Sequence, residues 1–332
     1  MKALQCVELA GPEKLVFSEV DDPKPGSGQV LLEIKAASVN FPDVLMIQGL
    51  YQNQPPMPFI PGAECSGVIS EIGEGVDSCS VGDHVFVMAG TGCFAEKLVV
   101  DAASVTLIPK AMDFPVAAAL PMTYGTSLYS LKQRANLQPG ETLLVLGAAG
   151  GVGLSAVEIG KAMGARVIAA ASSEEKTKIC LKHGADEAFV YPSGDLDREQ
   201  QKELSNKIKE LTGGLGANVV YDPVGGSFSE PALRAMAWEG RFLVIGFAAG
   251  EIPKLPLNLA LLKNCQIVGV FWGAWTLMFP AEHEKNLQEL FDLHADGKIN
   301  PEISDRFSLE ESAAAIAHLK DRKAKGKVII DV

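Results

Sequence analysis

The pattern of apolar and polar positions is that of short strands at the start of the chain. Up to about residue 100, segments that alternate apolar and polar side chains are separated by Gly and Pro; they read LVFSEV, QVLLEIKAASV, SGVISEIG, HVFVMA and FAEKLVV. Alternation with a period of two, interrupted by frequent turns, is typical of antiparallel strands. We therefore expect an antiparallel β domain with Greek-key or barrel character.

The pattern changes after residue 114. An Ala-rich helical region over 114–137 is followed by apolar strands expected at 142–147, 166–171, 188–191, 218–222, 241–246 and 266–271, with helices at 152–163, 176–182, 198–212 and 228–238 between them. Apolar strands that alternate with helices predict a doubly wound parallel sheet. From Ala274 the chain turns to helix and closes with a β-like KVIIDV. The predicted domains are 1–120 with 274–332, and 121–273.

A glycine-rich turn joins the first apolar strand of this second domain to its first helix. It reads Ala148-x-Gly150-x-x-Gly153, which is the G-x-G-x-x-G spacing with Ala in the first place. Such a turn lets the backbone approach a pyrophosphate, and the helix N-terminus offers N–H groups to it. The alternative is a turn that only packs the helix on the sheet. The flanking strand and helix favour a dinucleotide site.

The end of the second strand indicates which nicotinamide cofactor binds. NAD sites place an Asp or Glu there to hold the ribose hydroxyls. This chain instead has Ala171, Ser172 and Ser173, with Lys176 one helical turn later. Two hydroxyls and a cation suit a 2′-phosphate, which favours NADPH. The competing interpretation is a serine N-cap and a solvated surface lysine.

Composition excludes several classes of protein. A formal net charge of -12 argues against a nucleic-acid surface. No apolar run reaches the roughly 18 residues that span a bilayer, and the N-terminus has neither a signal-peptide core nor a transit pattern. The six cysteines form no C-x-x-C pair and the five histidines no metal-type cluster. We expect a cytoplasmic protein without a disulfide framework or a zinc ribbon.

The order of the motifs resembles the zinc-free quinone oxidoreductases (zeta-crystallin-like) of the medium-chain dehydrogenase/reductase superfamily over essentially the whole chain. The motifs are SVNFPDV, PGAECSGVI, VGDHVF, LGAAGGVG, YDPVGG, GRFLVIGFAAG and the closing GKVIIDV. The resemblance implies a GroES-like antiparallel β domain joined to a Rossmann domain. It also implies an NADPH:quinone oxidoreductase that acts without zinc.

The zinc alcohol dehydrogenases of that superfamily provide the contrast. They carry a ligand Cys where this chain has Asn40, the His of G-H-E-x-x-G where it has Ala63, and a second Cys near Met122. An amide, a methyl group and a thioether cannot hold the zinc that activates an alcohol. The four-cysteine lobe for structural zinc is missing too. We therefore expect no bound metal.

The resemblance also implies the site residues. Asn40, Tyr51 and Tyr124 are the candidate catalytic residues, with the Asn40 amide as donor to a developing oxyanion and the tyrosines as possible hydroxyl donors. Asp43 is expected to orient the Asn40 loop, and Leu45 stands where some relatives have a tyrosine. The residues implied to bind the cofactor, besides Asn40, are Thr126, Ala149, Gly150, Gly151, Val152, Gly153, Ser172, Ser173, Lys176, Tyr191, Gly246, Phe247, Ala248, Phe271, Trp272 and Gly273.

Three functions fit this set of candidate site residues. The first is an NADPH-dependent quinone reductase, which transfers hydride to a quinone or a related conjugated carbonyl. The second is a 2-enoyl thioester or enone reductase, although no Lys/Arg cluster near the β-domain loops supports a phosphorylated carrier. The third is a non-catalytic NADPH-binding protein. We also expect a homodimer paired through the edge strand QIVGVF of the parallel sheet.

Overall fold

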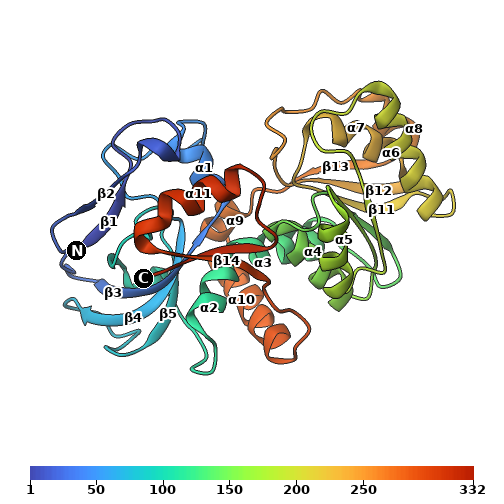
Figure 1. The fold of residues 1–332 in the computed structure, drawn as a ribbon. Helices are drawn as coiled ribbons and strands as arrows, with labels where there is room; N and C mark the ends of the chain where they lie inside the picture. Colours follow the sequence, from blue (N-terminus) through green and yellow to red (C-terminus); the bar gives the residue numbers. More distant parts are fainter. The chain divides into compact units, whose positions relative to one another are not determined.

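The computed structural model describes residues 1–332, and they form two compact units. Unit 1 comprises Met1–Met122 and Pro301–Val332, and unit 2 comprises Thr123–Asn300 (Figure 1). The division expected from the sequence placed 274–300 with the first domain, whereas these residues belong to unit 2. The reason is packing, because the Trp275 ring stacks on Tyr129 at 4.4 Å between ring centroids and Gln133 Nε2 donates to Asn286 Oδ1 at 2.9 Å.

Unit 1 is built on a seven-stranded sheet with the order β14-β15-β3-β4-β5-β7, in which β6 also pairs with β3. All of these pairs are antiparallel except β14 with β15. The strands are β3 Gln29–Val39, β4 Glu64–Ile72, β5 His84–Met88, β6 Lys97–Asp101, β7 Val105–Leu107, β14 Ile303–Ser308 and β15 Lys327–Asp331; β1 Lys2–Gln5 and β2 Val16–Glu19 form a separate antiparallel pair. The N-terminal antiparallel β domain is confirmed.

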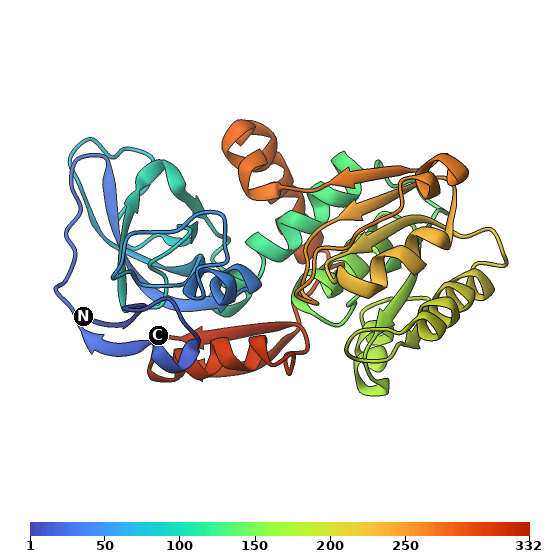
Figure 2. The same ribbon diagram turned by 90° about the horizontal axis from the view of Figure 1, so that it is seen from above.

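The C-terminal segment of the chain completes unit 1. Strand β15 inserts between β14 and β3, and its Val328, Ile329 and Ile330 are buried. Helix α11 (Ser312–Lys320) lies beside α1 (Phe41–Ile47), next to the N-terminal strands (Figure 2). The remaining helical elements of this unit are α2 Phe114–Ala119, η1 Pro12–Lys14, η2 Ala102–Ser104 and η5 Leu309–Glu311.

Unit 2 is a six-stranded parallel sheet with the order β10-β9-β8-β11-β12-β13. This is the 3-2-1-4-5-6 order of a doubly wound dinucleotide fold, as predicted. Its strands are β8 Thr142–Val145, β9 Arg166–Ala171, β10 Glu187–Val190, β11 Ala217–Asp222, β12 Met236–Val244 and β13 Gln266–Gly269. Helices α4 Gly151–Ala162 and α5 Glu174–Lys182 cover one face, while α6 Arg198–Leu211, α7 Ser229–Arg234 and α8 Asn258–Lys263 cover the other (Figure 1).

Unit 2 has further helical elements besides those that cover its sheet. They are α3 Pro121–Leu128, which starts at the end of unit 1, the π-helical segment η3 Tyr129–Arg134, α9 Trp272–Met278, α10 Pro280–Ala295 and the short η4 Gly226–Phe228. Trp272 packs so closely on α3 that a Cβ at Gly125 would lie 2.4 Å from its ring. Glycine at this position therefore lets α9 pack closely against α3.

Two sequence-based boundaries were wrong. The helix expected over 114–137 is broken into α2, α3 and η3, because Pro121 lacks an N–H and begins a new helix. The helix expected to run to residue 238 ends at Arg234, and β12 starts at Met236, which pairs with Ala217 before a register shift. Glu239 then takes a φ of 60° inside the strand, an irregularity that no apolar periodicity signals.

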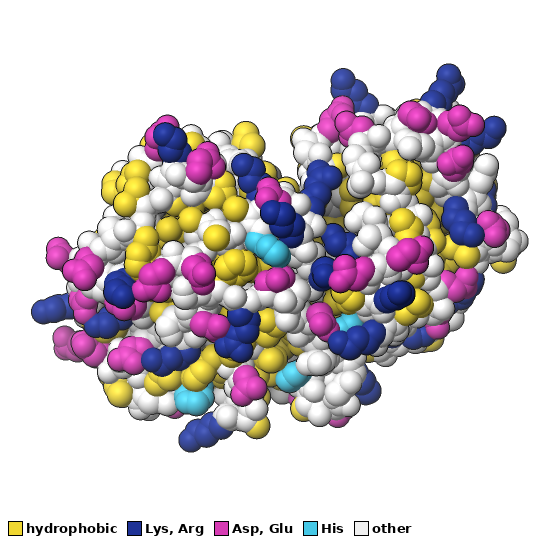
Figure 3. Space-filling view, viewed as in Figure 1, with side chains coloured by type: hydrophobic (Ala, Val, Ile, Leu, Met, Phe, Trp, Pro, Cys, Tyr) yellow, Lys and Arg dark blue, Asp and Glu magenta, His cyan; other side chains and the backbone are white.

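The face in Figure 3 carries acidic and basic side chains interspersed with apolar ones. None of the helices combines the length and the apolar composition that crossing a bilayer requires.

Candidate active site

The glycine turn of unit 2 has the geometry of a dinucleotide cradle. Strand β8 ends at Val145 and α4 begins at Gly151, with Gly147 at a φ of 59° between them. A Cβ at Gly153 would come 2.3 Å from the Gly147 carbonyl oxygen, so only glycine allows α4 to approach the turn this closely. The first-turn N–H groups of α4 have no acceptor within the helix. The turn fits a pyrophosphate.

The residues expected at the adenosine phosphate follow the carboxyl ends of the neighbouring strands β9 and β10. Ser173 is the N-cap of α5, and its Oγ accepts from Lys176 N at 3.3 Å. Ser172 and Lys176 are half-buried beside it. Tyr191 follows β10 and packs its ring on Phe228 at 4.9 Å. Ser173 thus has the capping role that was the alternative interpretation, while the 2′-phosphate role of Ser172 and Lys176 stays a prediction.

The residues expected along the nicotinamide half also follow carboxyl ends of the parallel strands. Gly246, Phe247 and Ala248 come directly after β12, and Ala248 N donates to Pro223 O at 3.0 Å. After β13, Phe271 is 62% exposed while Trp272 is 4% exposed. Phe271 is therefore not a core residue. Gly273 lies on α9 and Thr126 is half-buried on α3, both in unit 2.

A buried polar network in unit 1 surrounds Asn40, the N-cap of α1. Asn40 Nδ2 donates to Glu64 Oε1 at 2.8 Å and to Ser38 O at 3.2 Å. Lys327 Nζ donates to Asn40 Oδ1 at 2.7 Å and to Glu64 Oε1 at 3.0 Å. The side chains of Lys327 and Glu64 are 3% and 0% exposed, so they form a buried ion pair. Neither residue of this pair is marked as a site residue by a local sequence pattern.

Asp43 orients the Asn40 loop, as expected. Its Oδ2 accepts from Asn40 N at 2.7 Å, which completes a capping box at the start of α1. Burial raises the pKa of Asp43 to about 7, against the lowering effects of its backbone hydrogen bonds and of Lys327, and Glu64 raises it further. Burial also raises the pKa of Tyr51, with Asp43 as a second cause.

The two candidate tyrosines differ in their surroundings. Tyr51 is half-buried and packs against the core of unit 1. Tyr124 is 2% exposed in unit 2, and its hydroxyl donates to Glu158 Oε2 at 2.5 Å. Glu158 also accepts from the Asn300 backbone N–H, at 3.2 Å, and its Oε1 lies 2.6 Å from His183 Nδ1. The Tyr124 hydroxyl is thus already committed to a structural carboxylate.

The positions that align with zinc ligands lie together in unit 1. Asn40 Nδ2 and Met122 N both donate to the Glu64 carboxylate at 2.8 Å, and Ala63 directly precedes Glu64. Zinc takes thiolate, imidazole or carboxylate ligands. Here the Asn40 amide oxygen accepts from an ammonium, the other two positions offer a methyl and a thioether, and Lys327 already neutralises Glu64. No three His, Cys, Asp or Glu side chains cluster in a way that could hold a metal ion. This donor set does not fit zinc.

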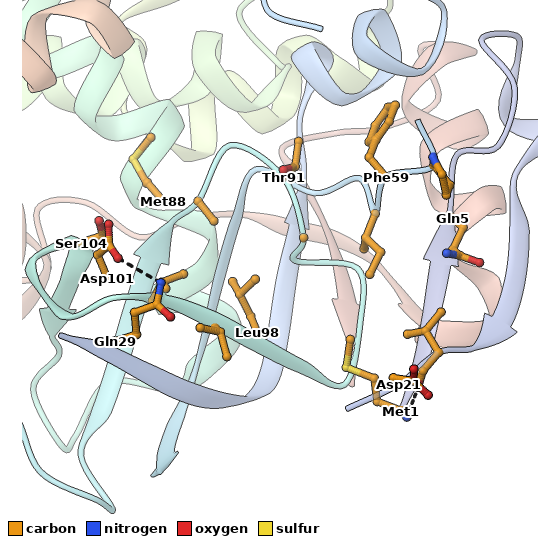
Figure 4. A pocket seen from close by; sticks show the side chains of 17 residues that line it. Met1, Gln5, Asp21, Gln29, Phe59, Met88, Thr91, Leu98, Asp101 and Ser104 are labelled. Carbon is orange, nitrogen blue, oxygen red and sulfur yellow. Dashed lines mark hydrogen bonds between the residues drawn. The ribbon is translucent and has the colours of Figure 1, made fainter. Parts of the chain in front are cut away.

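A groove of about 670 Å³ on unit 1 is lined by other residues (Figure 4). Its lining mixes apolar side chains such as Phe59 and Leu98 with Gln5, Gln29 and Asp101, and includes none of the candidate site residues. Gln29 Nε2 donates to Asp101 Oδ1 at 3.3 Å within it. The groove brings together no group of side chains with a chemical role.

Comparison with known proteins covers both units. The model of the alcohol dehydrogenase GroES-like domain matches residues 26–110, and that of the zinc-binding dehydrogenase matches residues 151–292. The second match includes none of Asn40, Ala63 and Met122. The chain is 37% identical to rat (Rattus norvegicus) quinone oxidoreductase-like protein 2, over 100% of the chain and 92% of that protein.

Two further relatives carry the same family name, quinone oxidoreductase. The chain is 33% identical to the Pseudomonas aeruginosa quinone oxidoreductase over 99% of both chains. The crystal structure of Escherichia coli quinone oxidoreductase complexed with NADPH matches with a TM-score of 0.90 and 28% identity over 100% of both chains. The chain therefore belongs to the quinone oxidoreductase family of the medium-chain dehydrogenase/reductase superfamily.

Proposed function

We propose that this protein is an NADPH-dependent quinone reductase that transfers hydride, without a metal, to a quinone or a related conjugated carbonyl. The observation that carries the proposal is a complete dinucleotide turn in a chain whose aligned zinc positions cannot hold zinc. Membership of the quinone oxidoreductase family supports an NADPH-linked oxidoreductase. The choice of a quinone as acceptor is the finer part of the proposal.

Two observations support NADPH as the cofactor. No Asp or Glu stands at the end of β9 itself to accept from ribose hydroxyls; Ser172 stands there, and Lys176 follows in the first turn of α5 beside the exposed Glu174 and Glu175. The Escherichia coli relative was crystallised with NADPH. A cationic ammonium on the first turn of α5, next to backbone N–H groups, suits a phosphate dianion.

Bound NADPH supplies the hydride, and the acceptor must tolerate the negative charge that develops. A quinone delocalises that charge, so it needs fixed hydrogen-bond donors more than a strong acid. We assign such a donor role to the Asn40 side-chain amide. Its bond to Ser38 O, at 3.2 Å, is the longer of its two, and in this bond a substrate oxygen would replace Ser38 O as the acceptor.

After hydride transfer the reduced acceptor must take up a proton, and two of the candidate residues are not placed to donate it. The Tyr124 hydroxyl is held by Glu158, and Asp43 is fully buried against the Asn40 backbone. Tyr51 is the half-buried hydroxyl of the candidate set. We therefore retain Tyr51 as the candidate donor and assign Asp43 to positioning.

We further propose that two copies pair through β13. This strand is an edge of the parallel sheet, and Ile267 on it is 38% exposed. The segments that precede and follow β13 in the chain, including α8 and α9, carry exposed apolar side chains; they include Leu261, Leu262, Phe271, Leu277 and Met278. An unpaired edge with an apolar border favours association with a second copy.

Purified protein should oxidise NADPH, followed at the nicotinamide absorbance, when an ortho-quinone is supplied and not when a short 2-enoyl-CoA replaces it. Turnover on the enoyl-CoA alone would instead assign an enoyl thioester reductase. Tight NADPH binding with no turnover on either acceptor would identify a binding protein.

Replacing Lys176 by Ala should weaken NADPH binding about 10- to 100-fold, because a charged hydrogen bond to phosphate contributes about 1.5–3 kcal/mol. NADH, which lacks the 2′-phosphate, should bind the variant as it binds the wild type. Calorimetric titration measures both. Lys178→Ala, on the exposed side of the same helix, is the matched control. Equal losses for NADPH and NADH would contradict the phosphate assignment.

Light scattering after size exclusion should give twice the 35.2 kDa of one chain. Ile267→Arg places a charge on the β13 edge and should yield a monomer. Leu215→Arg, at a side chain that is 82% exposed and outside β13, should leave the dimer intact. A monomeric wild type at micromolar concentration would refute the pairing.

Asp43→Asn should change how stability depends on pH. Because the folded-state pKa of about 7 lies above the unfolded value, the folded protein holds the extra proton and loses stability as pH rises from about 4 to 7. The unfolding free energy of the variant, relative to wild type, should therefore rise by about 2–3 kcal/mol between pH 5 and pH 8. Urea denaturation measures it. The exposed Asp77→Asn is the control, and a difference that does not vary with pH would contradict the assignment.

A further inference from the structure

Lys327 is a buried cation that no part of the proposed chemistry yet uses. It is the first residue of β15, and its side chain is 3% exposed. Its Nζ has two acceptors, Asn40 Oδ1 at 2.7 Å and Glu64 Oε1 at 3.0 Å. A buried ammonium is costly unless it is paired and hydrogen-bonded, and here both conditions are met.

This contact decides which way the Asn40 amide points. An ammonium can only donate hydrogen bonds, so the atom of Asn40 that faces it must be the oxygen. A carboxylate can only accept, so the atom that faces Glu64 at 2.8 Å must be the nitrogen. The reversed amide would place NH₂ against NH₃⁺ and oxygen against carboxylate. Lys327 and Glu64 together therefore allow one orientation of Asn40.

The same contact strengthens Asn40 as a donor. A cation on the amide oxygen withdraws electron density from the nitrogen, and hydrogen bonds in a chain polarise one another. One N–H of Asn40 is held by Glu64, while the other faces Ser38 O at the longer distance of 3.2 Å. The second N–H is thus both polarised and the more weakly held.

We propose that Lys327 is a positioning residue for hydride transfer. Its ammonium fixes and polarises the Asn40 amide through the amide oxygen, while Glu64 accepts a hydrogen bond from the amide nitrogen. The inference rests on the proposed function, in which Asn40 donates to the acceptor oxygen. Lys327 itself touches neither cofactor nor acceptor in this role. Replacing Lys327 should therefore change turnover only when Asn40 is present.

A double-mutant cycle on turnover tests this dependence. Lys327→Met removes the ammonium, and we expect the kcat with NADPH and an ortho-quinone to fall about 10- to 100-fold, as for a misplaced group in an active site. The KM for NADPH should stay within about twofold, because the phosphate residues lie in unit 2 and are unchanged. In an Asn40→Ala background, the same substitution should cause no further loss of kcat.

One additional variant serves as a control, and a second replaces Lys327→Met in case that variant does not fold. Lys323→Met, at an exposed lysine of the same C-terminal segment, should leave kcat unchanged. If Lys327→Met alone does not fold because Glu64 is left as an unpaired buried charge, the Glu64→Gln, Lys327→Met pair removes both charges and takes its place in the cycle. Losses of kcat that multiply in the Asn40→Ala background would overturn the proposal, and so would an unchanged kcat in Lys327→Met.

A spectroscopic readout separates this inference from the proposed function. The side-chain ¹⁵N amide signals of Asn40, identified by their loss in Asn40→Ala, should be protected from solvent exchange in the wild type and lose protection in Lys327→Met. This comparison needs no turnover, so it stands even if neither a quinone nor an enoyl-CoA is reduced. Amide signals that are the same in both proteins would show that Lys327 does not hold Asn40. Failure of the proposed function alone would appear as inactive wild type with the expected change in these signals.

Discussion

The buried ion pair between Lys327 and Glu64 is the interaction on which unit 1 depends. It joins β15, from the end of the chain, to β4 and to the Asn40 N-cap of α1. The other oxygen of Glu64 accepts from Met122 N, the last residue of the first segment of unit 1. With both side chains inaccessible to water, removal of either partner leaves an uncompensated charge, which costs about 3–5 kcal/mol. One pair therefore links four separate parts of the sequence.

The same pair explains why this site differs in chemistry from a zinc site. A catalytic zinc needs three protein ligands and an open position. Here the carboxylate that stands among the aligned positions is already neutralised by an internal cation, and the Asn40 oxygen is already bonded. In the proposed function, the Asn40 amide acts as an oriented hydrogen-bond donor in place of a Lewis acid. Such donors suit an acceptor that delocalises its own charge, as a quinone does.

Unit 2 depends on close backbone approaches that glycine permits. The glycines of the turn after β8 permit contacts that a single Cβ would block, and Gly125 does the same for Trp272 on α3. Apart from Asn40, the residues expected at the cofactor follow the carboxyl ends of the parallel strands or lie on the adjoining helices of unit 2. Glu158 then ties Tyr124 and Asn300, near the two ends of this unit, to the dinucleotide helix α4.

The sequence by itself determined the two folds, the dinucleotide turn and the family, because strand alternation, helical periodicity and glycine spacing are local patterns. It also identified Asn40, Ala63 and Met122 as positions without zinc ligands. The tertiary structure decided the rest. That 274–300 pack in unit 2, that β12 starts at Met236 and that Phe271 is exposed depend on contacts between distant segments. The orientation of the Asn40 amide depends on Lys327, 287 residues away in the chain, and no local pattern contains a hydrogen bond of that range.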